Sequence, residues 1–125
     1  MAEKRRLLIV DDSRVIVEGL SAFFAPVFKV LAAHSGPEAL ALIEQSSEPI
    51  DLVITDLFLP GQSGLALAGI IKARCPQLPV IVMTGWKEQH DALAQDSRAD
   101  AVLSKPFDLS ELRAAVDRLL ACGES

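Results

Sequence analysis

Short apolar runs alternate along the chain with longer segments that have helical periodicity. Runs of this kind are typical of strands that are buried on both faces of a parallel sheet. Five of them predict strands, at Leu7–Val10, Val27–Leu31, Leu52–Ile54, Pro79–Met83 and Ala101–Leu103. The second run carries Lys29 in its middle, and a charge in that place favours a strand at the edge of the sheet.

The segments between these runs place their apolar residues on one face of a helix. The clearest pattern is in the last segment, at Leu109, Leu112, Val116, Leu119 and Leu120. Ser35 and Glu38 have the spacing of a capping box at the start of the second helix. Between 87 and 96 the pattern is weak, because Leu93 is nearly the only large apolar residue there.

Strand and helix therefore alternate five times within 125 residues. Such alternation requires a crossover between parallel strands, with helices covering both faces of the sheet. The sequence predicts an α/β fold with a doubly wound five-stranded parallel sheet, either flavodoxin-like or a Rossmann variant. The length is that of one domain, and no repeat or linker divides it, so we expect residues 1–125 to form a single domain.

The composition excludes several classes of function. The formal net charge is −5 and the only basic run is at residues 4–6, so we expect no direct binding of nucleic acid. The apolar runs are too short for a signal peptide or a membrane span, which favours a cytoplasmic protein without membrane contact. Cys75 and Cys122 lack the spacing of metal ligands. His34 and His90 have no evident partners, and we expect both to be exposed.

Polar residues that can carry chemistry follow four of the five predicted strands. Asp11 and Asp12 follow the first strand, Asp56 the third, Thr84 the fourth and Lys105 the fifth. The carboxyl ends of parallel strands meet at one edge of the sheet, where open α/β sheets bind their ligands. We therefore expect these five side chains to converge on one site.

The three carboxylates of this predicted site would repel one another. At a separation of about 4 Å and an effective dielectric constant near 20, each pair costs on the order of 4 kcal/mol. A cation must offset this charge, or one carboxyl group must be protonated. Oxygen ligands without histidine or cysteine favour Mg²⁺ over Zn²⁺, and a carboxylate beside such an ion can attack phosphorus. No glycine-rich phosphate loop is present, which argues against ATP or a dinucleotide as substrate.

Four segments that contain these residues resemble the receiver domain of two-component response regulators. They are LLIVDDS with the acidic pair, DLVITDLFLPGQSG with Asp56, VIVMTG with Thr84 and LSKPF with Lys105. They occur in the order and with the separations of a receiver, over essentially the whole chain. The resemblance implies a flavodoxin-like (βα)5 fold with strand order 2-1-3-4-5. It also implies a signalling phosphoprotein that catalyses only its own phosphorylation and dephosphorylation, and is not otherwise an enzyme.

The resemblance implies a role for each matching position. Asp56 would accept a phosphoryl group from a histidine kinase or a histidine phosphotransfer protein. Asp12 would be the main acidic ligand of Mg²⁺, assisted by Asp11, by Asp56 and by the backbone carbonyl of Phe58. The phosphorylated and unphosphorylated forms would then differ in conformation, which is how a receiver signals.

Other positions would support the phosphoryl group and the loop around it. Thr84 would move toward a phosphoryl oxygen, and Lys105 would pair with another. Gly61 and Gly64 would let the loop after Asp56 turn tightly.

One position departs from the family pattern. Receivers usually place Tyr or Phe, as a rotameric switch, three residues before the lysine, where this chain has Val102.

Receivers usually dimerise or dock through the face of the fourth helix, fifth strand and fifth helix, so a homodimer through this face is expected. Charged pairs there could come from Asp100, Arg113, Asp117 and Arg118.

Three alternatives remain open. A pseudo-receiver would bind partners without accepting phosphate, although the set Asp12, Asp56, Thr84 and Lys105 is complete. A hydrolase of the haloacid-dehalogenase type would need Asp-x-Asp after the first strand, and this chain has Asp-Asp-Ser. The chain could also be the receiver part of a longer transcription factor or output enzyme.

Overall fold

Five parallel strands form one sheet in the order β2-β1-β3-β6-β7, which is the strand order that we predicted. The structure is a computed structural model, and it describes residues 4–45, 47, 49–85, 99–104 and 108–122. The strands are β1 Arg6–Val10, β2 Lys29–Ala33, β3 Leu52–Asp56, β6 Val80–Thr84 and β7 Ala101–Ser104. The predicted helix at 87–96 lies outside the described residues.

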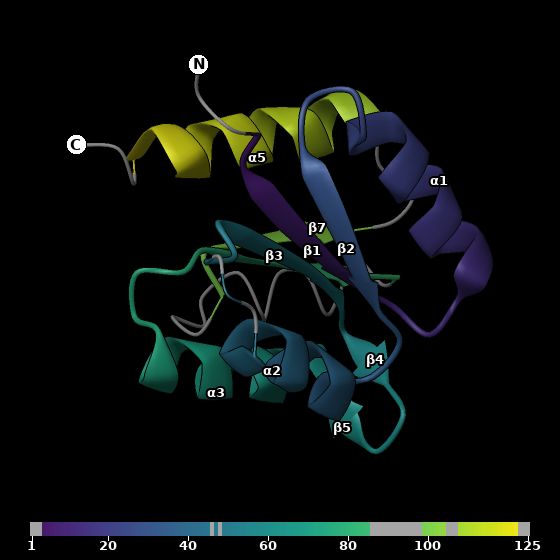
Figure 1. The fold of residues 1–125 in the computed structure, drawn as a ribbon. Coiled ribbons are helices and arrows are strands. Elements are labelled where there is room, and N and C mark those ends of the chain that lie inside the picture. The colour runs from purple at the N-terminus through teal and green to yellow at the C-terminus, as the bar shows by residue number, and fades with distance from the viewer. Residues whose placement is uncertain (1–3, 46, 48, 86–98, 105–107, 123–125) are drawn as a thin grey trace.

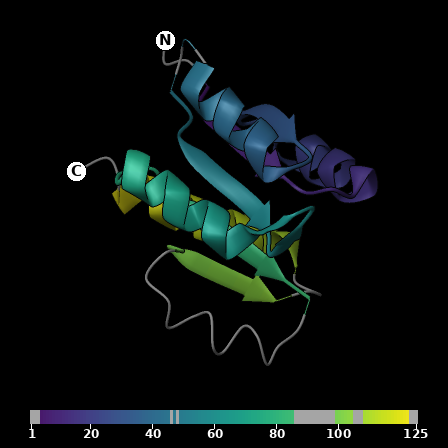
Figure 2. The same ribbon diagram turned by 90° about the horizontal axis from the view of Figure 1, so that it is seen from below.

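Helices cover both faces of this sheet, as a doubly wound fold requires. Within the described residues they are α1 Arg14–Phe24, α2 Gly36–Gln45, α3 Gly64–Arg74 and α5 Leu109–Cys122. The helices α1 and α5 lie on one face, and α2 and α3 lie on the other (Figure 1). In the view from below, α2 and α3 lie in front of the sheet (Figure 2). None of the described helices is both long and apolar enough to cross a bilayer.

Each strand contributes to two hydrophobic cores, because successive side chains point to opposite faces. Leu7 and Ile9 of β1 belong to the core that α1 and α5 complete. Leu8 and Val10 belong to the core that α2 and α3 complete. The central strands β1, β3 and β6 are therefore buried on both faces, which explains their continuous apolar sequences. Strands β2 and β7 lie at the edges and are partly exposed.

The second strand begins two residues later than we predicted, at Lys29 instead of Val27. Phe28 belongs to the turn that leaves α1, because its N–H donates to the carbonyl of Phe24 at 2.8 Å and its ring packs edge-to-face on the Phe24 ring. The strand pairing starts with the register Arg6↔Lys29 and ends at Val10↔Ala33. Lys29 is thus the exposed first residue of an edge strand, as its charge indicated.

A short antiparallel hairpin follows β3, and the sequence did not predict it. It pairs β4 Phe58–Leu59 with β5 Gln62–Ser63. Gly61 lies in its turn at φ 72°, a left-handed conformation that favours glycine. Ser63 then caps α3, since its side chain accepts a hydrogen bond from the N–H of Ala66 at 3.0 Å. The hairpin thus connects the end of β3 directly to the start of α3.

Candidate functional site

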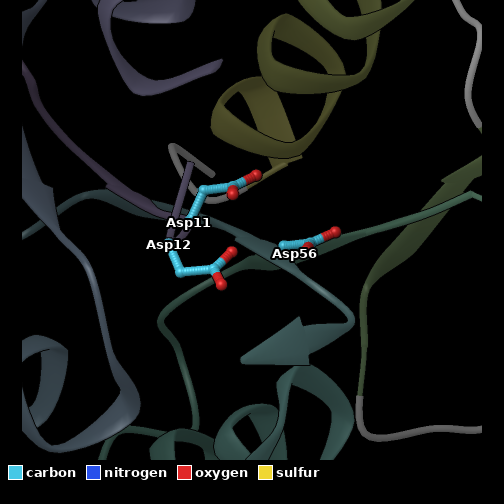
Figure 3. A group of neighbouring side chains, drawn as sticks. All are labelled: Asp11, Asp12 and Asp56. Atoms are coloured by element: carbon cyan, nitrogen blue, oxygen red, sulfur yellow. The ribbon is translucent and has the colours of Figure 1, made fainter. Parts of the chain in front are cut away.

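The carboxyl ends of β1 and β3 bring three acidic side chains together. Asp11 and Asp12 directly follow β1, and Asp56 is the last residue of β3. One carboxylate oxygen from each residue lies within 4.8 Å of the corresponding oxygens of the other two. The three side chains extend to the same side from neighbouring strand ends (Figure 3). The topology of the sheet thus assembles the acidic cluster that we expected.

The three acidic residues differ in exposure. Asp11 is buried, with 2% of its surface exposed, whereas Asp56 is half-buried and Asp12 is exposed. Asp11 is held through its backbone and through its side chain, because its N–H donates to the carbonyl of Ala33 at 3.1 Å and its Oδ1 accepts the N–H of Ser13 at 2.9 Å. Asp12 is therefore the carboxylate that solvent reaches most easily.

Thr84 ends the strand next to Asp56. Asp56 pairs in register with Met83 of β6, and Thr84 is the following residue, fully buried and in register with Ser104 of β7. Thr84 thus lies at the same edge of the sheet as the acidic cluster. Lys105 follows Ser104 directly but lies outside the described residues, so its expected position beside the cluster stays a prediction.

The backbone around Asp56 is closely packed. The carbonyl of Asp56 accepts the hydroxyl of the buried Thr55 at 3.0 Å. A Cβ added at Gly64 would collide with the same carbonyl and would lie 3.1 Å from the Cα of Leu57. The N–H of Leu57 donates to the carbonyl of Met83 at 2.8 Å. Gly64 is therefore needed because the start of α3 approaches the backbone of the site, which agrees with the tight loop that we predicted.

Phe58 lies two residues after Asp56 and begins β4. Its side chain is 55% exposed, so the hydrophobic core does not require this ring. The residue pairs with Ser63 across the hairpin. The predicted use of its backbone carbonyl as a metal ligand stays a prediction.

His34 belongs to the site, and the expectation that it is exposed and without partners was wrong. Its ring is half-buried, and Nδ1 lies 3.1 Å from the carbonyl oxygen of Asp11. Its backbone N–H donates to Oε2 of Glu38 at 3.1 Å. The register Val10↔Ala33 places the residues after both strands side by side. The contact was missed because the predicted second strand ended at Leu31, so the sequence did not place His34 directly after a strand.

Val102 lies in the edge strand β7 and pairs with Val82. It is partly buried and packs against the core on the side of α2 and α3. An aliphatic side chain at this position has neither the ring nor the hydroxyl on which an aromatic rotameric switch depends. The departure seen in the sequence therefore persists in the structure.

The donor atoms of the acidic cluster suit a hard divalent cation. All three side chains offer carboxylate oxygen, and among the described residues no other group of three or more acidic, histidine or cysteine side chains is close enough to hold a metal ion. Oxygen donors of this kind match Mg²⁺, which takes one or two carboxylates and completes its coordination with other oxygen atoms. The residues present therefore fit this ion.

The family model described as response regulator receiver domain matches residues 7–117 of the chain. The response regulator MprA of Mycobacterium avium (strain 104) is 34% identical over 117 residues, which cover 92% of this chain and 50% of that protein. The sensor kinase CckA of Brucella abortus (strain 2308) is 32% identical over 91% of this chain and 12% of the kinase. The chain thus spans half of one relative and a small part of the other.

Solved structures have the same fold. The response regulator protein TrrA from Thermotoga maritima, in complex with Mg(2+)-BeF, is 33% identical with a TM-score of 0.81, and the match covers 92% of this chain and 98% of that one. A CheY-like response regulator receiver domain protein from Methanospirillum hungatei JF-1 is 27% identical with a TM-score of 0.87, and the match covers 98% of each chain.

Proposed function

Because the chain belongs to the family of response regulator receiver domains, we propose that Asp56 is its phosphoacceptor and that a histidine kinase or a histidine phosphotransfer protein is its phosphoryl donor. The observation that carries this proposal is the position of Asp56 at the end of β3, with a carboxylate oxygen within 4.8 Å of those of Asp11 and Asp12. The product is an aspartyl phosphate on the domain itself. The domain is a signalling module that processes only its own phosphoryl group.

The acidic cluster would hold Mg²⁺ through Asp11, Asp12 and Asp56, together with the backbone carbonyl of Phe58. When bound, the ion supplies positive charge that offsets the repulsion between the carboxylates and the phosphoryl oxygens. Two observations support this assignment, namely the all-oxygen donor set and the Mg(2+)-BeF bound to the related regulator TrrA.

The side chains of this chain have separate tasks in the transfer. An oxygen of Asp56 forms a bond to phosphorus while the bond between phosphorus and the donor's histidine nitrogen breaks. Thr84, at the neighbouring strand end, would donate its hydroxyl to one phosphoryl oxygen, and Lys105 would pair with another. Phosphoryl transfer depends mainly on such positioning and charge compensation, which a rigid sheet edge supplies.

The face that includes β7 and α5 would bind a second copy or an output partner, and the predicted fourth helix that belongs to the expected interface lies outside the described residues. Most of the charged residues that we expected to pair there are already engaged within the domain. Arg113 Nε bonds Asp117 Oδ1 at 3.0 Å, and Asp100 binds Lys72 Nζ at 2.6 Å. Apolar contacts of the edge strand would therefore carry more of such an interface than these charges.

The relatives also bear on the setting of the domain. Because MprA is twice as long as the matched region, the chain could act within a longer regulator or output enzyme as well as alone. A single domain over 1–125, a cytoplasmic location and the lack of nucleic-acid binding stay predictions.

Intact-mass measurement after incubation with Mg²⁺ and acetyl phosphate tests the proposal. We expect the protein to gain one phosphoryl group, and we expect Asp56→Asn to gain none. Asp117→Asn is the matched control, because it removes a carboxylate from the exposed surface of α5 and should leave the gain unchanged. An unmodified protein without turnover of acetyl phosphate would indicate a pseudo-receiver, and turnover that persists in Asp56→Asn would indicate a hydrolase.

A further inference from the structure

His34 connects the acidic cluster to the second helix. It directly follows β2, and its ring nitrogen Nδ1 lies 3.1 Å from the carbonyl oxygen of Asp11. A carbonyl oxygen can only accept, so Nδ1 carries the hydrogen of this bond. The ring is half-buried, which limits competition from water for the same oxygen. The contact is therefore a directed hydrogen bond from a side chain to the backbone of the site.

This bond acts on the peptide unit that links Asp11 to Asp12. The N–H of Asp11 is already bonded to the carbonyl of Ala33 at 3.1 Å, so the strand end holds one side of the residue. His34 holds the other side, at the carbonyl. Because the peptide unit is planar, fixing that oxygen also fixes the direction of the N–H and Cα of Asp12. Asp12 is exposed, so packing alone does not hold it.

His34 is itself attached to a rigid element. Its backbone N–H donates to Oε2 of Glu38 at 3.1 Å, and the N–H of Glu38 donates to Oγ of Ser35 at 3.3 Å. These bonds tie the loop to the first turn of α2. A group that orients a functional side chain is effective when its own position is fixed in this way.

We propose that His34 is a positioning residue: its Nδ1–H bond to the carbonyl of Asp11 orients the Asp11–Asp12 segment and thereby raises the affinity of the acidic cluster for a divalent cation. The inference rests on the proposed function, because it assumes that this cluster binds Mg²⁺. Groups that orient metal ligands from outside typically change metal affinity by about 10- to 100-fold. His34 bonds the ligand's backbone and not its carboxylate, so we expect a smaller change, of about fivefold.

Two amide substitutions isolate the Nδ1 contact. In His34→Asn the amide nitrogen takes about the place of Nδ1 and can still donate to Asp11. In His34→Gln the amide nitrogen takes about the place of Nε2 and cannot. Both replacements are polar and of moderate size, so both variants should fold, and thermal unfolding without metal verifies this.

The experiment measures the dissociation constant of Mg²⁺ by titration calorimetry, and the rate of phosphorylation by acetyl phosphate at limiting and saturating Mg²⁺. We expect His34→Gln to bind Mg²⁺ about fivefold more weakly and His34→Asn to stay within about twofold of the unchanged protein. The rate for His34→Gln should fall at limiting Mg²⁺ and recover at saturation. A role in stability alone would lower the unfolding temperature and leave the dissociation constant unchanged.

Two results would overturn the inference. Equal Mg²⁺ affinity in His34→Gln and the unchanged protein, while the latter is phosphorylated, would refute the role of His34 alone. Failure of the unchanged protein to bind Mg²⁺ and to accept phosphate would refute the proposed function together with this inference.

Discussion

The two ends of the parallel sheet use aspartate in different ways. At the amino ends, Asp51 and Asp100 each form two hydrogen bonds with the backbone of the first residue of a neighbouring strand. The N–H of Asp51 donates to the carbonyl of Arg6 at 2.8 Å, and its Oδ2 accepts the N–H of Arg6 at 2.7 Å. Asp100 makes the same pair of bonds with Val80, both at 2.8 Å. Each carboxylate there satisfies a strand N–H that would otherwise lack a partner in the sheet.

At the carboxyl ends, the carboxylates gather around one another. Oxygen atoms of Asp11, Asp12 and Asp56 approach within 4.8 Å, an arrangement in which like charges oppose the folded state. The residue type alone therefore does not identify a functional aspartate. A carboxylate that accepts the backbone N–H of a strand end stabilises the fold, whereas a carboxylate that faces other carboxylates is available to a cation and a phosphoryl group.

The largest expected effect comes from Gly64→Ala, which would disturb the carboxyl end alone. The new Cβ would collide with the carbonyl of Asp56 and press on Leu57, and backbone atoms cannot move aside as a flexible side chain can. We expect a loss of about 3 kcal/mol in the free energy of unfolding, together with much slower phosphorylation. Urea denaturation and intact-mass kinetics measure the two effects.

Gly19→Ala is the matched control, because a Cβ at that position in α1 meets nothing within 4 Å. It should stabilise the protein by up to about 1 kcal/mol through helix propensity.

In Gly64→Ala the amides of Arg6 and Val80 should remain protected from hydrogen exchange, since the hydrogen bonds that Asp51 and Asp100 form with them lie at the other end of the sheet. Full stability of Gly64→Ala would contradict the close approach of α3 to Asp56.

The next effect in size belongs to the amino end. Asp100→Ala removes the acceptor for the N–H of Val80 and the partner of Lys72, whose Nζ lies 2.6 Å from Oδ2. We expect the free energy of unfolding to fall by about 1 to 2 kcal/mol, reduced from the range for charged hydrogen bonds because the side chain is partly exposed. Phosphorylation of the folded protein should keep its rate.

Asp117→Ala is the control for Asp100→Ala. It removes a carboxylate whose partner, Arg113, lies on the same exposed helix face at 3.0 Å. Pairs of this kind contribute up to about 0.5 kcal/mol, so the loss should be small. A slower phosphorylation of Asp100→Ala would contradict the idea that the amino end of the sheet is structural and the carboxyl end is functional.

Much of the fold was predictable because periodicity reports burial. The strands β1, β3 and β6 are buried on both faces, so their sequences are continuously apolar, and the order of elements follows. The bounds of β2 were not predictable. At its start, the apolar Phe28 belongs to the turn after α1, and at its end the strand has two alanines, which are helix formers. The hairpin β4–β5 was missed because its two strands have two residues each.

In the site, the acidic side chains were predictable, whereas a contact with the backbone was not. Asp11, Asp12 and Asp56 were predictable, because polar residues directly after buried strands must meet at one sheet edge. The contact of His34 was not, because its partner is a backbone carbonyl, and every residue has one. Only the register of β1 and β2 shows which carbonyl lies within reach of the ring.

The smallest expected effect is that of Asp12→Asn. It distinguishes the two kinds of aspartate most directly, because the free energy of unfolding should rise in this variant, whereas it should fall in Asp100→Ala. In Asp12→Asn a like charge leaves the cluster, so without metal we expect the free energy of unfolding to rise by about 1 kcal/mol, the Coulomb energy of two such charges in water. Mg²⁺ at about ten times its dissociation constant should stabilise the unchanged protein by about 1.4 kcal/mol and Asp12→Asn by much less. Urea denaturation with EDTA and then with Mg²⁺ measures both quantities. A metal-independent loss of stability in Asp12→Asn, like that expected for Asp100→Ala, would place Asp12 among the structural carboxylates.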